Sequence, residues 1–117
     1  MDSSILRVQK KTSPPVAQTC RTRLIVSNAI GLHARSASVI VKTLQKYDSV
    51  IVMTYGDKSA NAKSIMGILA LCAGKGAEVE ITADGHDAGE AVRTIEYLFA
   101  CSFHENESEA EKFFREP

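Results

Sequence analysis

Cysteine, proline and tryptophan are scarce in this sequence, and the cysteines are the most informative of the three. Among 117 residues there is no tryptophan, and there are only three prolines and three cysteines. Cys20, Cys72 and Cys101 are odd in number, lie far apart and form no C-x-x-C pair, which argues against a disulfide framework and a structural zinc site. We therefore expect three reduced thiols in a reducing compartment.

The sequence also lacks an excess of charge of either sign and a long apolar run. Lysine and arginine together number 14, as do aspartate and glutamate, so no single-sign field favours binding to nucleic acid or to an anionic membrane. The first twenty residues contain no uninterrupted apolar run, and no stretch approaches the roughly 20 apolar residues that span a bilayer. We expect a cytoplasmic protein with neither nucleic acid nor a membrane as its partner.

The chain divides into one domain and two short extensions. Residues 1–19 show little hydrophobic periodicity and contain Pro14 and Pro15, which predicts a flexible leader. Residues 105–117 are rich in glutamate and are predicted to form an acidic tail or to extend the last helix. The length of the whole chain fits a single domain, which we place over residues 20–104.

Within residues 20–104 the hydrophobic period switches between that of strands and that of helices. Alternating or β-branched runs predict four strands, over 20–26, 50–55, 58–62 and 77–83. Apolar spacings of three and four predict three helices, over 34–47, 64–70 and 87–99. Asp87 and Glu90 resemble a capping box at the start of the last helix. The order β-α-β-β-α-β-α predicts an α+β fold with helices on one face of a mostly antiparallel sheet.

The segment Gly31–Arg35 places a histidine and an arginine where a loop becomes a helix. The first turn of a helix presents unpaired N–H groups and a partial positive charge, which together stabilise an anion by about 0.3–1 kcal/mol. Neutral His33 at this position is a competent nucleophile, and Arg35 can offer several donors to phosphate oxygens. The segment is therefore a candidate phosphoryl-transfer site, although a helix start with a surface histidine shows the same pattern.

The helix predicted after Lys63 is apolar nearly all round. Ile68 and Leu71 can face the core, and Ile65, Met66 and Leu69 then lie toward solvent. An exposed apolar patch on a small protein is often a docking surface, and methionine adapts to partners of several shapes. The alternative is that the leader or the tail covers this patch.

Two motifs at this separation match a known family. Gly31-Leu-His-Ala-Arg35, Asn61-Ala-Lys-Ser-Ile-Met-Gly67, Gly76 and the Ala83-Asp-Gly85 turn together resemble HPr, the histidine-containing phosphocarrier of the bacterial phosphoenolpyruvate-dependent sugar phosphotransferase system. The resemblance runs through residues 20–104. It implies an open-faced β-sandwich, a four-stranded antiparallel sheet with three helices on one face. It also implies that enzyme I phosphorylates His33 on Nδ1 and that the phosphoryl group passes to enzyme IIA domains.

The resemblance also assigns roles to other residues. Arg35 steadies the phosphoryl group; Ile65, Met66 and Leu69 fall on the partner-docking patch; and Ser64 falls on the serine that HPr kinase/phosphorylase modifies in many bacteria. Ser64 is equally a good helix N-cap whatever else it does. The family usually has proline where this chain has Ser36. Because proline suits a helix start, Ser36 is expected to loosen the start of this helix slightly while adding an N–H group and a hydroxyl near the site. Phosphorylation is expected to survive this change, with altered stability of the phosphoryl group or altered partner preference.

Three functional hypotheses follow. The first is a monomeric phosphoryl carrier that is not an enzyme and needs no cofactor or metal. The second is a regulatory module that acts through phosphorylation at Ser64 and binds a transcription regulator or an enzyme. The third, a small phosphatase, is disfavoured because no second acid, base or metal cluster stands out near His33. His86 and His104 are expected to be ordinary surface residues.

Overall fold

Seven strands and helices follow one another in the predicted order. The computed structural model describes residues 18–104, and its elements are β1 (Gln18–Ile25), α2 (Ala34–Leu44), β2 (Val50–Tyr55), β3 (Lys58–Asn61), α3 (Ile65–Leu71), β4 (Glu78–Gly85) and α4 (Ala88–Ala100). A short 3-10 turn, Ser102–His104, follows α4. β1 begins two residues before the predicted domain boundary; the rest of the predicted leader and the acidic tail lie outside the described residues.

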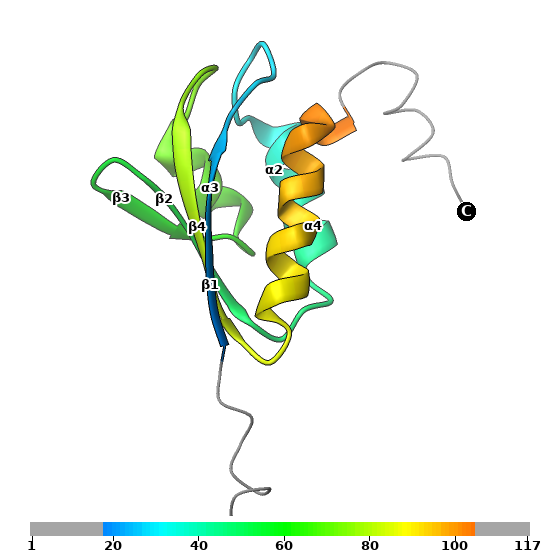
Figure 1. Cartoon of the computed structure of the whole chain (residues 1–117). Coiled ribbons are helices and arrows are strands. Elements are labelled where there is room, and N and C mark those ends of the chain that lie inside the picture. Colours follow the sequence, from blue (N-terminus) through cyan, green and yellow to red (C-terminus); the bar gives the residue numbers. More distant parts are fainter. Residues whose placement is uncertain (1–17, 105–117) are drawn as a thin grey trace, which may run out of the picture.

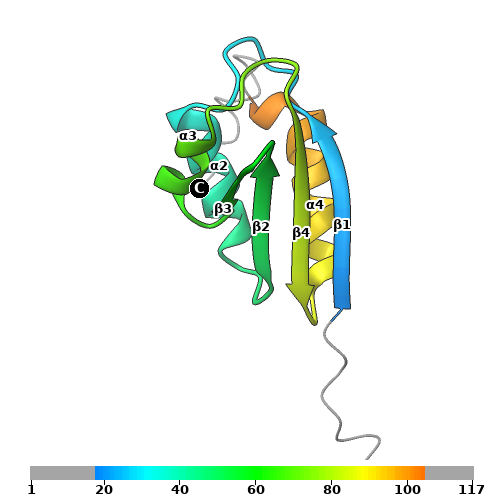
Figure 2. The ribbon, with the colours of Figure 1, turned by 90° about the vertical axis from the view of Figure 1, so that its left-hand side faces the viewer.

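The four strands form one antiparallel sheet in the order β1-β4-β2-β3. Figure 1 shows α2 and α4 on the same side of this sheet, and Figure 2 shows β4 between β1 and β2. Helix α3 packs against α2 and against β3 at the edge of the sheet. The predicted α+β fold, a four-stranded antiparallel sheet with three helices, is confirmed. Within the described range, no helix combines the length and the apolar character needed to cross a membrane.

The hydrophobic core lies between the sheet and the helices. In the central strands every second residue is buried, and the side chains of Ile51, Met53, Val79 and Ile81 are at most 1% exposed. The helices contribute Ala37, Ile40 and Leu44 from α2, Ile68 and Leu71 from α3, and Ala91, Ile95 and Leu98 from α4. These are the inward positions that the three- and four-residue spacings predict. Burial of each large apolar side chain contributes about 1.5–3 kcal/mol to stability.

The end of α2 and the capping of α4 differ from the prediction. The apolar spacing extends to Tyr47, but α2 ends at Leu44. Tyr47 lies in the loop that follows α2 and is nevertheless buried, and its hydroxyl shares a 2.6 Å hydrogen bond with Thr94.

The predicted capping box at α4 is wrong, because the Asp87 side chain makes no hydrogen bond to its own helix. Its carboxylate instead accepts hydrogen bonds from the N–H groups of Asp48 and Ser49, at 2.9 and 3.0 Å, and from the Ser49 hydroxyl.

Candidate functional site

The loop that leads into α2 is fixed by backbone contacts with the segment that follows α3. Gly31 has φ +84°, and a Cβ built on it would lie 2.6 Å from the Cα of Gly74. This close approach lets the Leu32 N–H donate to the carbonyl of Ala73 at 2.9 Å. The Asn28 side-chain amide donates to the Gly31 carbonyl at 2.6 Å. The backbone before His33 is therefore held on both sides, as a precise site requires.

His33 is the N-cap of α2 and turns one ring nitrogen toward the helix. Its φ and ψ of −136° and −174° are extended, and Nδ1 accepts a hydrogen bond from the Arg35 N–H at 3.3 Å. Nε2 is buried. In a neutral imidazole the nitrogen that accepts a hydrogen bond carries the lone pair, so the proton is assigned to Nε2 and the lone pair to Nδ1. The ring therefore presents Nδ1 to the first-turn amides.

Ser36 closes the start of α2 from the other direction. Its hydroxyl accepts a hydrogen bond from the His33 N–H at 2.9 Å and donates one to the His33 carbonyl at 3.1 Å. The side chain is fully buried, and the two residues form a reciprocal capping box. The expectation that serine loosens this helix start is wrong, because its hydroxyl occupies the N–H group that a helix N-terminus otherwise leaves unpaired.

The remaining predicted site residues lie on α2 and α3, which are packed together. Arg35 is exposed on the first turn of α2. Ser64 caps α3, where its hydroxyl accepts a hydrogen bond from the Gly67 N–H at 3.0 Å. Ile65 and Met66 are 38% and 74% exposed, as predicted. Leu69 is half-buried and packs against the core, which corrects its expected position toward solvent.

One exposed apolar side chain in the loop before His33 was not predicted from the sequence. Ile30, three residues before His33, is 72% exposed. It belongs to no periodic segment, so only its apolar character within a loop could have marked it. The ammonium group of Lys63, just before Ser64, donates a hydrogen bond to the Tyr47 carbonyl.

A separate cluster of ionisable groups lies between the α2–β2 loop and the β4–α4 turn, at the opposite end of the sheet from the start of α2 (Figure 1). Ligand atoms of Asp48, His86 and Asp87 come within 4.8 Å of one another, close enough to hold a metal ion. However, His86 Nε2 already contacts Asp48 at 3.0 Å, and the Asp87 carboxylate is bonded to the 48–49 backbone. We interpret the cluster as an ion-paired anchor between two loops.

The charges of this anchor shift two pKa values. The hydrogen bond to Asp48 and the nearby charge of Asp87 raise the pKa of His86. Hydrogen bonds from Ser49 and Asp48 lower the pKa of Asp87 to about 2. His86 is exposed, as predicted, but it is paired. His104 lies in the final 3-10 turn, and its expected surface position stays a prediction.

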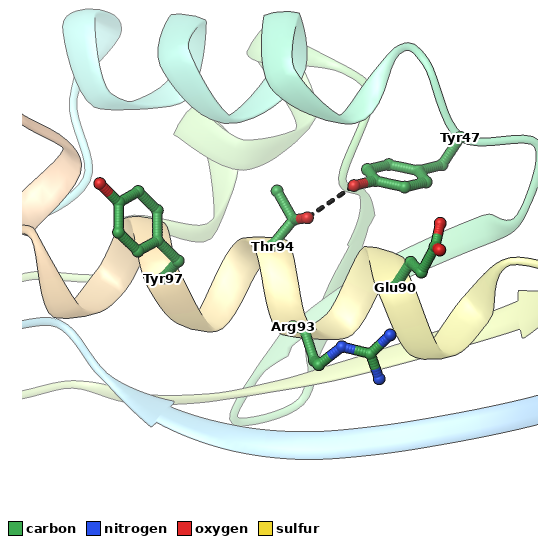
Figure 3. Close-up of a pocket in the computed structure, with 5 residues that line it drawn as sticks. All are labelled: Tyr47, Glu90, Arg93, Thr94 and Tyr97. Carbon is green, nitrogen blue, oxygen red and sulfur yellow. Dashed lines mark hydrogen bonds between the residues drawn. The ribbon is translucent and has the colours of Figure 1, made fainter.

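A shallow pocket of about 290 Å³ lies along α4 (Figure 3). It is lined by Tyr47, Glu90, Arg93, Thr94 and Tyr97. The Tyr47–Thr94 hydrogen bond joins two of these side chains, and the lining residues come from α4 and the α2–β2 loop rather than from the start of α2. The pocket therefore supplies no acid or base beside His33.

Known proteins share both sequence and fold with this chain. A family model described as the PTS HPr component phosphorylation site matches residues 20–100. An HPr from Thermoanaerobacter tengcongensis is 37% identical, with a TM-score of 0.71 over 74% of this chain and 98% of that protein. The phosphocarrier protein HPr of Bacillus anthracis str. Ames is 36% identical, with a TM-score of 0.66 over 69% and 96% of the respective chains.

A third similar structure is that of Crh, a catabolite repression protein of Bacillus subtilis that was solved as a domain-swapped dimer. It is 33% identical, with a TM-score of 0.55 over 67% of this chain and 85% of that protein. The family model spans the fold from β1 to the end of α4, with His33 at the first turn of α2 inside it. The chain thus belongs to the HPr family of phosphocarrier components of the phosphotransferase system.

Proposed function

We propose that this protein is a cytoplasmic, monomeric carrier that accepts a phosphoryl group from phosphorylated enzyme I on Nδ1 of His33 and passes it to enzyme IIA domains. One observation carries the proposal: Nδ1 faces the first-turn amide of Arg35, whereas Nε2 is buried. The Nδ1 lone pair forms the new bond to phosphorus as the donor's bond to phosphorus breaks. The same exchange in reverse delivers the group to the next acceptor, so the carrier is regenerated without net chemistry of its own.

The surroundings of Nδ1 suit the charge that arrives with the phosphoryl group. The N–H groups of the first turn of α2 are directed at the ring, and the helix N-terminus favours an anion by about 0.3–1 kcal/mol. Arg35, exposed two residues after His33, is proposed to steady the phosphoryl oxygens. Because these groups stabilise the phosphoryl group without enclosing it, the group stays accessible to the next acceptor.

Partner docking is proposed to use the exposed side chains of α3. Ile65 and Met66 project toward solvent from a helix that packs beside α2. Leu69 of the same helix packs against the core, and its exposed part is proposed to add to this surface. An apolar patch beside the nucleophilic imidazole lets two partners use the same surface in turn. Both enzyme I and enzyme IIA would bind here.

The carrier proposal is tested by incubating the protein with enzyme I and labelled phosphoenolpyruvate. We expect one acid-labile, base-stable phosphate, absent from His33→Ala. His86→Ala is the matched control, because it removes another partly exposed histidine and should retain the label. An unlabelled wild-type protein that still unfolds cooperatively would rule out the carrier function.

A second candidate function is regulation through Ser64, which the similarity to Crh favours. A phosphate on this N-cap would be tolerated electrostatically at the start of α3 but would place roughly two negative charges beside Ile65 and Met66. We propose that HPr kinase/phosphorylase modifies Ser64 and that this weakens docking of enzyme I or creates a surface for a regulator. The test is an acid-stable phosphate made by that kinase and lost in Ser64→Ala; without it, the regulatory function fails.

A further inference from the structure

We propose that Ser36 is a positioning residue for phosphoryl transfer, whose backbone N–H is a second amide donor to the phosphoryl group on His33 and whose hydroxyl holds His33 in place. The inference rests on the proposed function, because it concerns how His33 carries its phosphoryl group. It goes further by assigning a role to a position where the family usually has proline, a residue with neither an N–H nor a hydroxyl.

The hydroxyl of Ser36 is hydrogen-bonded to both backbone groups of His33, the N–H and the carbonyl. It accepts from the His33 N–H at 2.9 Å and donates to the His33 carbonyl at 3.1 Å, and that carbonyl also accepts the Ala37 N–H at 2.8 Å. Ser36 is fully buried, so water does not compete for these bonds. Ser36 therefore sets the orientation of the His33 backbone. This orientation determines where the side chain, and with it the imidazole ring, leaves the backbone.

The backbone N–H of Ser36 completes the arrangement on the side of the ring. The side chain of His33 accepts from this N–H as well as from the N–H of Arg35. Phosphorylation of Nδ1 uses up the lone pair that accepts these bonds, so both N–H groups become available to the incoming phosphoryl oxygens. Hydrogen bonds to such an anionic oxygen are roughly twice as strong as neutral ones. Proline at position 36 would leave only the Arg35 N–H in this position.

The test uses phosphoramidate, which phosphorylates histidine without any enzyme. Nδ1 forms a bond to phosphorus, the phosphorus–nitrogen bond of phosphoramidate breaks, and ammonia leaves. We would compare wild type, Ser36→Ala, which keeps the N–H, and Ser36→Pro, which loses it. Ser38→Ala, at an exposed position on the same helix, is the matched control. The product is assigned to His33 by the phosphorus resonance that is missing from His33→Ala.

We expect the Ser36 amide proton to move downfield on phosphorylation, and the phosphohistidine half-life to shorten about three- to tenfold in Ser36→Pro on loss of one charge-assisted bond at a partly exposed site. In Ser36→Ala the phosphohistidine half-life should shorten about twofold, and in Ser38→Ala it should equal that of wild type. A half-life in Ser36→Pro equal to that of wild type would overturn the inference. So would an unmoved Ser36 amide, or a loss in Ser36→Ala as large as in Ser36→Pro.

The two proposals fail separately in these experiments. A protein that takes the phosphoryl group from phosphoramidate but not from enzyme I disproves the carrier relay and leaves the Ser36 measurements intact. A protein that is labelled by enzyme I but shows no dependence on residue 36 keeps the relay and disproves the role of Ser36. Thermal unfolding of each variant shows whether a shorter half-life has a structural cause.

Discussion

At the scale of single residues, the geometry of His33 depends on neighbours that take no part in phosphoryl chemistry. Gly31 has a positive φ, and the space where its Cβ would lie is occupied by the Cα of Gly74 at 2.6 Å and the carbonyl of Ala73 at 2.8 Å. Gly76 also has a positive φ, but nothing lies within 4 Å of its Cβ position. A comparison of Gly31 with Gly76 therefore separates the cost of the left-handed backbone conformation, which both share, from the cost of close contact, which only Gly31 has.

Gly31→Ala should therefore destabilise the protein more than Gly76→Ala. Forcing alanine into a left-handed conformation costs roughly 1–2 kcal/mol at either position. At Gly31 the clash with backbone atoms adds about 1–3 kcal/mol, because backbone cannot move aside like a flexible side chain. Urea unfolding of both variants measures the difference. Equal losses in the free energy of unfolding would show that the contact between Gly31 and Gly74 is not tight.

Ser64 is the N-cap of α3 and the proposed phosphorylation site, and substitutions can separate these two roles. Ser64→Ala removes the bond to the Gly67 N–H and should cost about 1 kcal/mol of stability. Ser64→Asp retains an N-cap acceptor and should stay within about 0.5 kcal/mol of wild type, while its charge beside Met66 slows labelling by enzyme I. Denaturant unfolding and the labelling rate of each variant check this. Slow labelling by Ser64→Ala alone would contradict the assignment, since that variant adds no charge.

At the scale of elements, α4 is attached to the α2–β2 loop through Asp87, and this attachment should depend on acid pH. The folded pKa of Asp87 is lowered to about 2, so its contribution to stability is fully present above the unfolded pKa of 3.8 and is lost as pH falls through about 2. The difference in Tm between wild type and Asp87→Asn should narrow from pH 4 to pH 2. Asp57→Asn, in the exposed β2–β3 turn, is the control and should change Tm little. A constant difference for Asp87→Asn would refute the attachment.

The His86–Asp48 pair of the same anchor should contribute to stability in a way that depends on pH near neutrality. Asp48 raises the folded pKa of His86, so the stability from this pair is present below the ordinary pKa of 6.5 and is lost as pH rises through the folded value. An NMR titration of His86 should show a midpoint above 6.5 that falls in Asp48→Asn. A midpoint that Asp48→Asn leaves unchanged would mean that the 3.0 Å contact does not persist in solution.

The elements themselves were largely predictable from local patterns, and their connections were not. The spacing of Ile51, Met53, Val79 and Ile81 marks inward strand positions, because alternation alone determines which side chains share a face. The N-cap positions of His33 and Ser64 follow from the turn chemistry around them. By contrast, the bonds of Asp87 to residues 48 and 49 join segments nearly 40 residues apart, and no local pattern records them. The capping box assigned to Asp87 failed for this reason.

In the candidate site, too, some features were predictable from local sequence patterns and others were not. The histidine and arginine were identified from their position at a helix start, and the apolar exposure of Ile65 and Met66 from helical spacing. The reciprocal bonds of Ser36 were missed because burial of a polar side chain at a first turn depends on what covers it. The sequence interpretation placed the serine hydroxyl near the site, but it did not predict the two hydrogen bonds that this hydroxyl makes to the His33 backbone.

At the scale of the whole molecule, the described residues form one continuous hydrophobic core. Its buried apolar residues run from Val26 to Phe103, and the sheet and helices lie within residues 18–104. The final core residue, Phe103, packs edge-on against Phe99 with ring centroids 4.7 Å apart, which joins the 3-10 turn to α4. We predict that the domain ends just after Phe103 and that residues 18–104 fold without the two extensions.

A chain limited to residues 18–104 should unfold cooperatively, with a Tm within about 4 °C of the full chain, the shift that corresponds to about 1 kcal/mol in a domain of this size. A further truncation at residue 101 removes Phe103 from the core and should lower the free energy of unfolding by about 3–5 kcal/mol, the range for deleting a buried aromatic side chain. Calorimetry of the three chains distinguishes these cases. If the 18–104 chain melts far below the full chain, the extensions pack on the domain, and Ile65 and Met66 become the first surface to examine. If it melts normally and enzyme I labels it at the full rate, residues 18–104 are sufficient to accept the phosphoryl group from enzyme I.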